Sequence, residues 1–217
     1  MAGLRYRVDA TTGGLVLTVL AICAIQMALP GTVTIGPTDF LPFVELAGIP
    51  IVAVLMVVAP EREAFIRGAM NFFLALLVAA TVMNALLLLW SLLSGTNESG
   101  VVLLFSGFGV LIINVLSFGL VYWWLDARNA GHDEERDSGR RELLYPQEGL
   151  DEHPHWQPSL MDYLYTAYTN IIAFSPTDTM PLSHRMKGLF TVQSATALLT
   201  IVVTLSRAIN LIPGGAS

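Results

Sequence analysis

The chain has 217 residues, of which 54% are hydrophobic and 13% are charged, and its formal net charge is −6. Soluble globular domains carry about 25% charged residues, and the charge here is crowded into a few stretches with long apolar runs between them. This composition indicates an integral membrane protein. It excludes a nucleic-acid-binding protein, because the sequence has no basic stripe and a single lysine.

Five apolar runs are long enough to cross a hydrocarbon layer of ~30 Å, which takes about 20 residues in a helix. A spanning segment must satisfy its own backbone hydrogen bonds, so we predict that these runs are helices. They cover residues 13–30, 41–60, 69–94, 101–125 and 188–212. The predicted fold is therefore an all-α, multi-pass integral membrane protein with five transmembrane helices.

The first run follows Arg5 and Arg7, as a signal peptide would. It is long, however, and no good cleavage site of small residues follows it, so we interpret it as a retained helix. The hydrophilic stretch 126–158 separates the fourth and fifth runs and holds most of the acidic residues. We predict a solvated, mobile loop in its middle, followed by an apolar patch with a turn at LLYPQEG.

A short segment before the last run combines a helical and an extended part. Residues 159–173 have a helix-compatible composition, and Ser159 and Asp162 stand at the N-cap and capping-box positions. This helix would be about four turns long, which is too short to span a bilayer. Two prolines then forbid its continuation, so an extended loop is predicted over 174–183. Irregular backbone at membrane depth must be buried in protein or line a water-filled cavity, so we predict a re-entrant helix and loop.

The spacing of two acids, a tyrosine and a proline in this segment points to a known family. Asp162 and Tyr165 form D-x-x-Y, and Asp178 and Pro181 form D-x-x-P, with a spacing of sixteen residues between the two acids. The segment thereby resembles the pore region of the potassium-channel superfamily in its two-helix form, where D-x-x-Y precedes T-V-G-Y-G-D-x-x-P. Gln193 falls where that family often has an acidic or amide residue early in the pore-lining helix. The segment also resembles the DUF1345-type bacterial membrane proteins.

The resemblance implies a pore, but the filter departs from the family. Where the family has T-V-G-Y-G, this chain has AFSPT, without either glycine. Filter glycines allow backbone angles that other residues avoid, so a potassium-selective carbonyl ladder is not expected. In a fourfold arrangement, Asp178 would form an acidic ring of the kind that cation channels use. The implied pore and filter residues are Ala173, Phe174, Ser175, Pro176, Thr177, Asp178 and Thr179, and the implied pore-helix and lining residues are Asp162, Tyr165, Thr169, Asn170 and Gln193.

Basic residues indicate the orientation. In an alternating five-span model, ten of the eleven Lys and Arg residues fall on one side, which the positive-inside rule makes cytoplasmic. The N-terminus and loop 126–158 are therefore predicted to be cytoplasmic in a plasma (inner) membrane. In potassium channels the pore loop enters from outside, so this chain has either an inverted pore module or a different number of spans.

A few polar residues interrupt the apolar runs. Glu45 and Arg207 are intramembrane charges that could pair with each other, although Arg207 could also extend to the interface. Asn84 and Asn114 are predicted to hydrogen-bond between helices. No standard ligand spacing for a metal and no catalytic motif is present, so neither a metal, nor another cofactor, nor enzymatic activity is expected.

These observations lead to one main functional prediction and two alternatives. Residues 1–100 would form three outer helices and residues 101–217 a pore-like module, assembled as a homo-oligomer, in particular a tetramer, in the lipid bilayer. The module would comprise helix 101–125, soluble loop 126–158, pore helix 159–173, filter-like loop 174–183 and helix 188–212. The assembly would pass small inorganic ions, with cations favoured. The alternatives are a non-conducting membrane scaffold or accessory subunit that retains the pore fold, and a secondary transporter.

Overall fold

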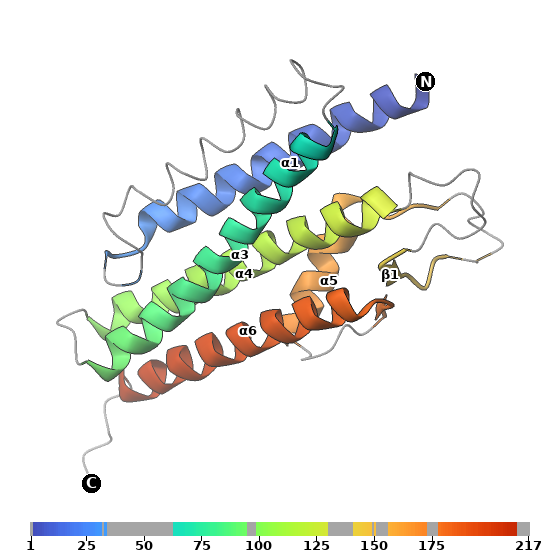
Figure 1. Cartoon of the computed structure of the whole chain (residues 1–217). Coiled ribbons are helices and arrows are strands. Elements are labelled where there is room, and N and C mark those ends of the chain that lie inside the picture. The colour runs from blue at the N-terminus through green and yellow to red at the C-terminus, as the bar shows by residue number, and fades with distance from the viewer. Residues whose placement is uncertain are drawn as a thin grey trace, which may run out of the picture. The chain divides into compact units, whose positions relative to one another are not determined.

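The computed structural model describes residues 2–31, 33, 63–94, 99–129, 141–148, 150, 156–172 and 178–211. Within these ranges the chain consists mostly of helices, with two very short strands and a few turns and extended residues (Figure 1). The helices are α1 (Ala2–Ala28), α3 (Glu63–Leu93), α4 (Gly100–Asn129), α5 (Leu160–Ile172) and α6 (His184–Leu211), and the strands are β1 (Leu143–Leu144) and β2 (Met180–Pro181).

Three of these helices are long and apolar enough to cross a membrane. They are Arg67–Leu93 in α3, Gly100–Asp126 in α4 and His184–Ser206 in α6, with 23 to 27 residues each. At 1.5 Å per residue they measure about 34 to 40 Å, more than the ~30 Å hydrocarbon layer. They contain most of three of the five predicted runs, which are thus confirmed as helices of spanning length.

The other two predicted runs differ from these three. The described apolar part of α1, Gly13–Ala28, is a shorter apolar helix. The run 41–60 lies outside the described residues. The described chain is therefore a helical protein with three helices able to span a membrane.

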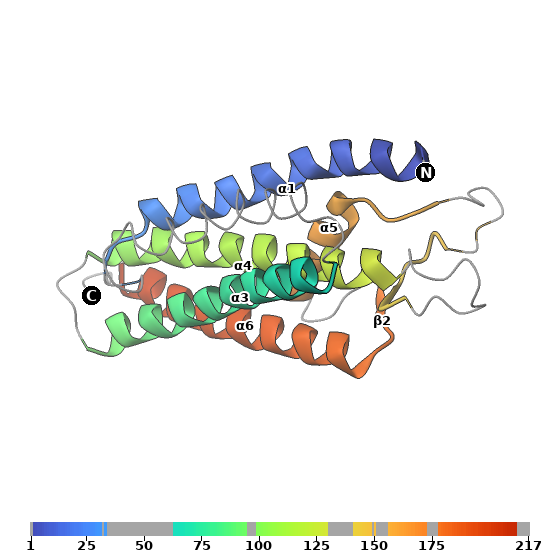
Figure 2. The same cartoon turned by 45° about the horizontal axis from the view of Figure 1, so that its top comes forward.

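The chain divides into two compact units. One unit comprises residues 1–15 and 118–195, and the other comprises residues 16–117 and 196–217. Helices α4 and α6 each contribute to both units, because the division falls within them. In the second unit, α3 runs alongside the first half of α4 (Figures 1 and 2).

Helices α4 and α6 approach each other closely in the second unit. A Cβ atom added at Gly107 of α4 would lie 1.9 Å from Oγ1 and 2.9 Å from Cβ of Thr204 in α6. Two residues along α4, a Cβ at Gly109 would lie 3.1 Å from Cδ2 of Leu29. Small residues at helix contacts let backbones approach, which is how helices associate in a membrane without a hydrophobic driving force.

Asn84 does not make the hydrogen bond between helices that the sequence predicts. It is fully buried in α3, and neither atom of its carboxamide group has a hydrogen-bond partner in the described part of the chain. The prediction is wrong for this residue because side-chain direction, which the sequence does not specify, decides whether a buried amide meets a partner.

The contact at Gly107 predicts the effect of a small substitution. Gly107→Ala should destabilise the folded protein by about 1–3 kcal/mol, since the added methyl group overpacks the contact with Thr204. Thermal unfolding in detergent micelles would measure this. Gly68→Ala is the matched control, because a Cβ there meets nothing within 4 Å and alanine favours a helix. Equal unfolding temperatures for the two variants would contradict the close approach.

Candidate functional site

The site is built around α5, a helix of 13 residues with one buried face. Buried residues recur three and four positions apart, at Tyr163, Thr166, Ala167, Asn170 and Ile171. This spacing places them on one side of a helix. The helix covers Leu160–Ile172, where the sequence predicts a short helix over 159–173. At about 20 Å it is too short to cross a hydrocarbon layer by itself.

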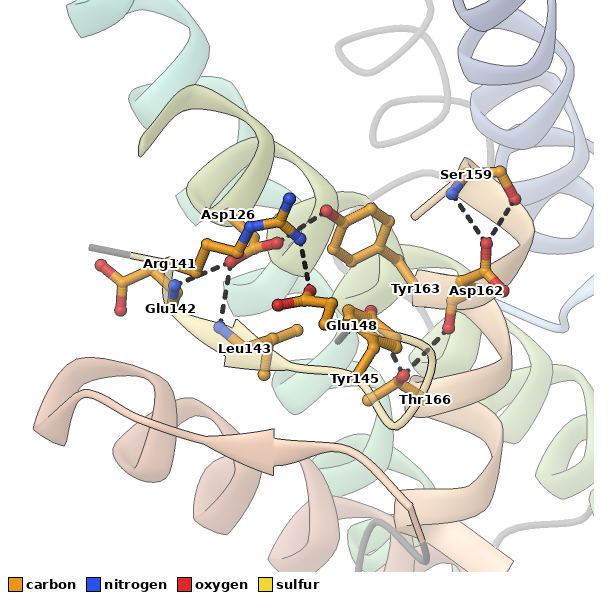
Figure 3. A network of polar contacts seen from close by, with 10 residues as sticks. All are labelled: Asp126, Arg141, Glu142, Leu143, Tyr145, Glu148, Ser159, Asp162, Tyr163 and Thr166. Atoms are coloured by element: carbon orange, nitrogen blue, oxygen red, sulfur yellow. Dashed lines mark hydrogen bonds and ion pairs between the residues drawn. The ribbon is translucent and has the colours of Figure 1, made fainter. Parts of the chain in front are cut away.

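Ser159 and Asp162 begin this helix as the capping box predicts. The Asp162 carboxylate accepts hydrogen bonds from the Ser159 backbone N–H and hydroxyl, both at 2.7 Å (Figure 3). The Asp162 N–H donates to the Ser159 carbonyl at 3.0 Å. Ser159 is thereby confirmed at the N-cap, and Asp162 makes its half of the capping box by accepting from the Ser159 N–H. The reciprocal bond to the Ser159 hydroxyl is replaced, because this hydroxyl donates to the Asp162 carboxylate.

The buried carboxamide of Gln193 in α6 joins three helices. Its Oε1 accepts hydrogen bonds from the Tyr122 hydroxyl of α4 at 2.6 Å and from Asn170 Nδ2 of α5 at 2.7 Å. Its Nε2 donates to the Ala167 carbonyl of α5 at 3.0 Å. Gln193 is 0% exposed, so these bonds take the place of the hydrogen bonds that its side chain would otherwise make with water. The amide therefore fixes α5 against both α4 and α6.

Asn170 adds further bonds to α6. Its Nδ2 also donates to the Phe190 carbonyl at 3.3 Å, and its Oδ1 accepts from the Ser194 hydroxyl at 3.1 Å. Gln193 lies nine residues after the start of α6, which corresponds to about 14 Å along the helix. The end of α5 thus meets α6 about 14 Å from the start of that helix.

Glycine permits the contact of α5 with α4. A Cβ atom at Gly119 would lie 2.6 Å from Cδ2 and 3.2 Å from the backbone Cα of Leu164. Because a backbone atom is involved, a side chain at position 119 could not be accommodated by a rotamer change alone. The two helices therefore depend on this glycine for their separation.

The described residues that follow α5 begin at Asp178, and the next one lies against the middle of that helix. Thr179, which precedes β2, is buried, and its hydroxyl lies 3.2 Å from that of Thr166, the central residue of α5. The strand β2 then pairs with β1 in an antiparallel ribbon, with Leu143 opposite Pro181 and Leu144 opposite Met180. Thr179 and β2, which precede α6, thus lie close to α5 and β1.

Asp126 connects this region to α4. Its Oδ1 accepts hydrogen bonds from the backbone N–H groups of Glu142 and Leu143 at 2.7 and 2.9 Å. Its Oδ2 accepts from the Tyr163 hydroxyl of α5 at 2.7 Å (Figure 3). The carboxylate is 1% exposed, so the three donors supply the partners that a buried charge requires.

The role of Asp126 was missed from the sequence, which places it at the first position of a solvated loop. Helix α4 instead continues to Asn129, so Asp126 is a helical residue. A signal was present, because Phe118, Tyr122 and Asp126 recur every four residues and so share one face of α4. All three are buried.

Two ion pairs hold the segment after the loop. Arg141 Nη1 donates to Glu148 Oε1 across the turn at Tyr145–Glu148, where the Glu148 N–H donates to the Tyr145 carbonyl. Glu142 accepts from Arg185 and from the hydroxyl of Ser183, the N-cap residue of α6. The predicted turn in LLYPQEG is confirmed. The Glu142–Arg185 pair connects this segment to α6, whereas the Arg141–Glu148 pair lies within the segment.

Burial changes the acidity of two groups in this segment. It raises the pKa of Tyr145 well above the ordinary value, and the carboxylates of Asp126, Asp162 and Glu148 add to the increase, although the nearby Thr166 hydroxyl opposes it. Burial also raises the pKa of Glu148, against the opposing effect of its Arg141 partner. Tyr145 packs edge-on against Tyr163, with ring centroids 5.7 Å apart, so the neutral phenol belongs to the folded state.

The predicted site residues have different positions in the structure. Asn170 and Gln193 are brought together, and Thr179 lies against α5. Asp178 and Tyr165 are exposed, and Thr169 donates to its own helix at the Thr166 carbonyl. Outside the described residues lie Ala173, Phe174, Ser175, Pro176, Thr177, Glu45 and the side chain of Arg207, whose backbone is part of α6.

Known proteins offer no direct comparison for this arrangement. The chain matches no protein-family model, no curated protein and no solved structure. Within the described part of the chain, no group of three or more His, Cys, Asp or Glu residues could hold a metal ion. The arrangement of α4, α5 and α6 therefore has to be interpreted from its own geometry.

Gln193 provides a test of the contact between the three helices. Gln193→Leu keeps a similar volume but removes the acceptor of the Tyr122 hydroxyl, one of two acceptors of Asn170 Nδ2 and the side-chain donor to the Ala167 carbonyl, so we expect a loss of about 2–4 kcal/mol of stability. Thermal unfolding in micelles would measure it. Thr191→Val is the matched control, since this exposed hydroxyl bonds only to its own helix. Equal stability of both variants would contradict the role of Gln193.

Asp126 provides a second, independent test. In Asp126→Ala the backbone N–H groups of Glu142 and Leu143 lose their acceptor, so their hydrogen exchange should accelerate about tenfold or more, corresponding to at least about 1.4 kcal/mol. Exchange detected by mass spectrometry on peptides covering 141–148 would report this. Asp162→Ala should loosen the start of α5 and leave these amides protected. Unchanged exchange in Asp126→Ala would exclude the proposed connection.

Proposed function

We propose that this chain is the subunit of a homo-oligomeric pore-loop protein, in particular a tetramer, that passes small inorganic ions across a membrane. The path runs through residues 173–179. The fold in this proposal has five transmembrane helices, with 13–30 and 41–60 as the first two, and a re-entrant segment formed by α5 and the loop after it. The membrane is a plasma (inner) membrane, with the N-terminus and the loop 126–158 on the cytoplasmic side.

One observation carries the proposal. Helix α5 is too short to span, its Asn170 bonds to Gln193 nine residues after the start of α6, and the strand β2 that follows α5 in the chain pairs with β1. A short helix with the segment after it packed nearby is what a re-entrant pore helix and loop require. Backbone that is neither helix nor sheet is tolerated at membrane depth only when protein or a water-filled path surrounds it.

The chemistry of the loop after α5 favours cations. Asp178 is exposed in the single chain, so its carboxylate is available to face a shared axis in an oligomer. A ring of such carboxylates selects cations. The segment AFSPT has neither filter glycine, so selection by a carbonyl ladder of the potassium-channel kind is not part of the proposal.

A non-conducting scaffold or accessory subunit is the second candidate. Pro176, which stands between the two positions where the family has its filter glycines, supports it, because proline fixes its own backbone angle and lacks an N–H group. The buried bonds of Asn170 and Gln193 would be needed equally by a protein that retains only the fold. The conducting pore and the non-conducting scaffold differ in whether the Asp178 carboxylate affects ion flux.

Ion flux through purified protein in liposomes distinguishes them. Asp178→Ala should lower cation flux about tenfold, equivalent to a barrier higher by about 1.4 kcal/mol, since the attractive charge is lost. Asp178→Lys should abolish cation flux or favour anions. Flux of potassium, sodium and chloride would be followed with ion-sensitive dyes in the vesicle lumen.

Glu63→Ala and Glu63→Lys are matched controls, because Glu63 is the acidic first residue of α3, outside the proposed path, and the charge changes are the same. They should leave flux unchanged. Absence of flux from folded wild-type protein would support the scaffold instead. Flux that is insensitive to residue 178 would exclude this loop as the path.

A further inference from the structure

The two-stranded ribbon has two faces of different character. In an antiparallel pair, directly opposite side chains lie on the same face and successive ones alternate. Leu143 pairs with Pro181 and Leu144 with Met180, and the Leu182 N–H donates to the Glu142 carbonyl at 2.9 Å, extending the register by one pair. The outer face, as we name it, therefore consists of Glu142, Leu144, Met180 and Leu182.

The two faces differ in burial. Leu143 on the inner face is 0% exposed. On the outer face, Leu144, Met180 and Leu182 are 40%, 63% and 50% exposed. Three large apolar side chains thus lie together on a surface next to ion pairs and polar turns. Exposing such a contiguous apolar patch to water is unfavourable.

A cation lies on the same face. Glu142 shares the outer face with Leu144, and its carboxylate accepts a hydrogen bond from Arg185. The Arg185 side chain is 55% exposed, whereas that of Glu142 is 9% exposed. A guanidinium group has five N–H donors, so most of them remain directed away from Glu142. The outer face therefore combines an apolar surface with an accessible, always-charged donor group.

The ribbon lies at one end of a membrane-spanning helix. Met180–Pro181 leads through Leu182 and Ser183 directly into α6 (Figure 2), whose candidate spanning stretch begins at His184 with the basic residues Arg185 and Lys187 in its first turn. Only three residues separate Met180 from this stretch. In a bilayer that α6 crosses from this end, the outer face would lie close to the level where acyl chains give way to headgroups.

We propose that the outer face is a binding site for a phospholipid of the adjoining leaflet. Acyl chains cover Leu144, Met180 and Leu182, and the lipid phosphate accepts hydrogen bonds from Arg185. A guanidinium group matches a phosphate in a bidentate geometry, and long apolar side chains beside it match the acyl boundary. This inference requires a membrane but is independent of ion conduction.

Lipid fits this surface better than a second copy of the chain. Standard protein interfaces involve about 20–30 residues on each side, whereas the outer face offers three apolar residues and one cation. Its position next to the start of the α6 span supplies a lipid leaflet without any further partner. A second copy remains a measurable outcome of the first test.

Site-directed spin labelling tests the apolar part. In a Cys23→Ser background, which removes the single cysteine, labels would replace Met180 and Leu144 in protein reconstituted in phosphatidylcholine–phosphatidylglycerol bilayers. Labels at Val202 in the α6 span and at exposed Gln157 before α5 serve as references. We expect molecular oxygen to relax the labels at Met180 and Leu144 as it relaxes the label at Val202, because oxygen concentrates in lipid.

Two results would overturn the apolar part of the site. Relaxation of the Met180 and Leu144 labels by a water-soluble nickel complex, as at Gln157, would place the face in water. Dipolar broadening between labels on different subunits would show that a second copy covers it. These measurements retain Arg185, so they do not depend on the folding of an Arg185 variant.

Phosphatidylglycerol binding tests the polar part. Native mass spectrometry of Arg185→Gln should show about fivefold weaker binding, the contribution of one basic residue near a lipid surface. Arg185→Lys, which retains the charge, should lose less. Lys187→Gln is the matched control, because this exposed cation lies two residues, or about 200°, around the same helix. Equal effects of Arg185→Gln and Lys187→Gln, or no effect of Arg185→Gln, would overturn the site.

Discussion

A single buried carboxamide group determines how the short helix α5 is held. Gln193 accepts from Tyr122 and Asn170 and donates to Ala167, so its two polar atoms find partners on both neighbouring helices. In an environment without water, an unpaired amide would cost several kcal/mol. The position of α5 between α4 and α6 is therefore the one in which these groups are all satisfied.

A second buried group holds the opposite end of α5. The Asp126 carboxylate accepts from Tyr163 in the first turn of α5 and from two backbone N–H groups just before and within β1. Charge-assisted hydrogen bonds of this kind are stronger than neutral ones. Because α5 is held at both ends, the segment 173–177 connects two fixed points, Asn170 on one side and Thr179 on the other.

This arrangement distinguishes two kinds of residue in the proposed pore loop. Asn170 and Gln193 bond to each other, so in the proposed pore they would position α5 and would not contact ions. Asp178, in contrast, is exposed and carries a charge in the segment that precedes β2. The lipid site proposed on the ribbon lies further along the same segment, since β2 begins two residues after Asp178 and ends shortly before α6.

The sequence by itself determined the features that depend on neighbouring residues. Apolar length identified α3, α4 and α6 as helices that can span, and the Ser159–Asp162 spacing identified the start of α5, because both signals arise within one helix. A family resemblance drew attention to Gln193, but not to its partners 71 and 23 residues away.

Only the tertiary structure decided the features that depend on distant residues. The sequence predicts that Asp126 is the first residue of a loop, yet its hydrogen-bond donors are 16, 17 and 37 residues further along the chain. The two-residue strands are too short to show an alternating pattern, so their pairing, and the outer face that results, could not be predicted. The physical reason is that the role of a buried polar group depends on the hydrogen-bond donors around it. Only the packing of segments that are distant in the sequence brings those donors together.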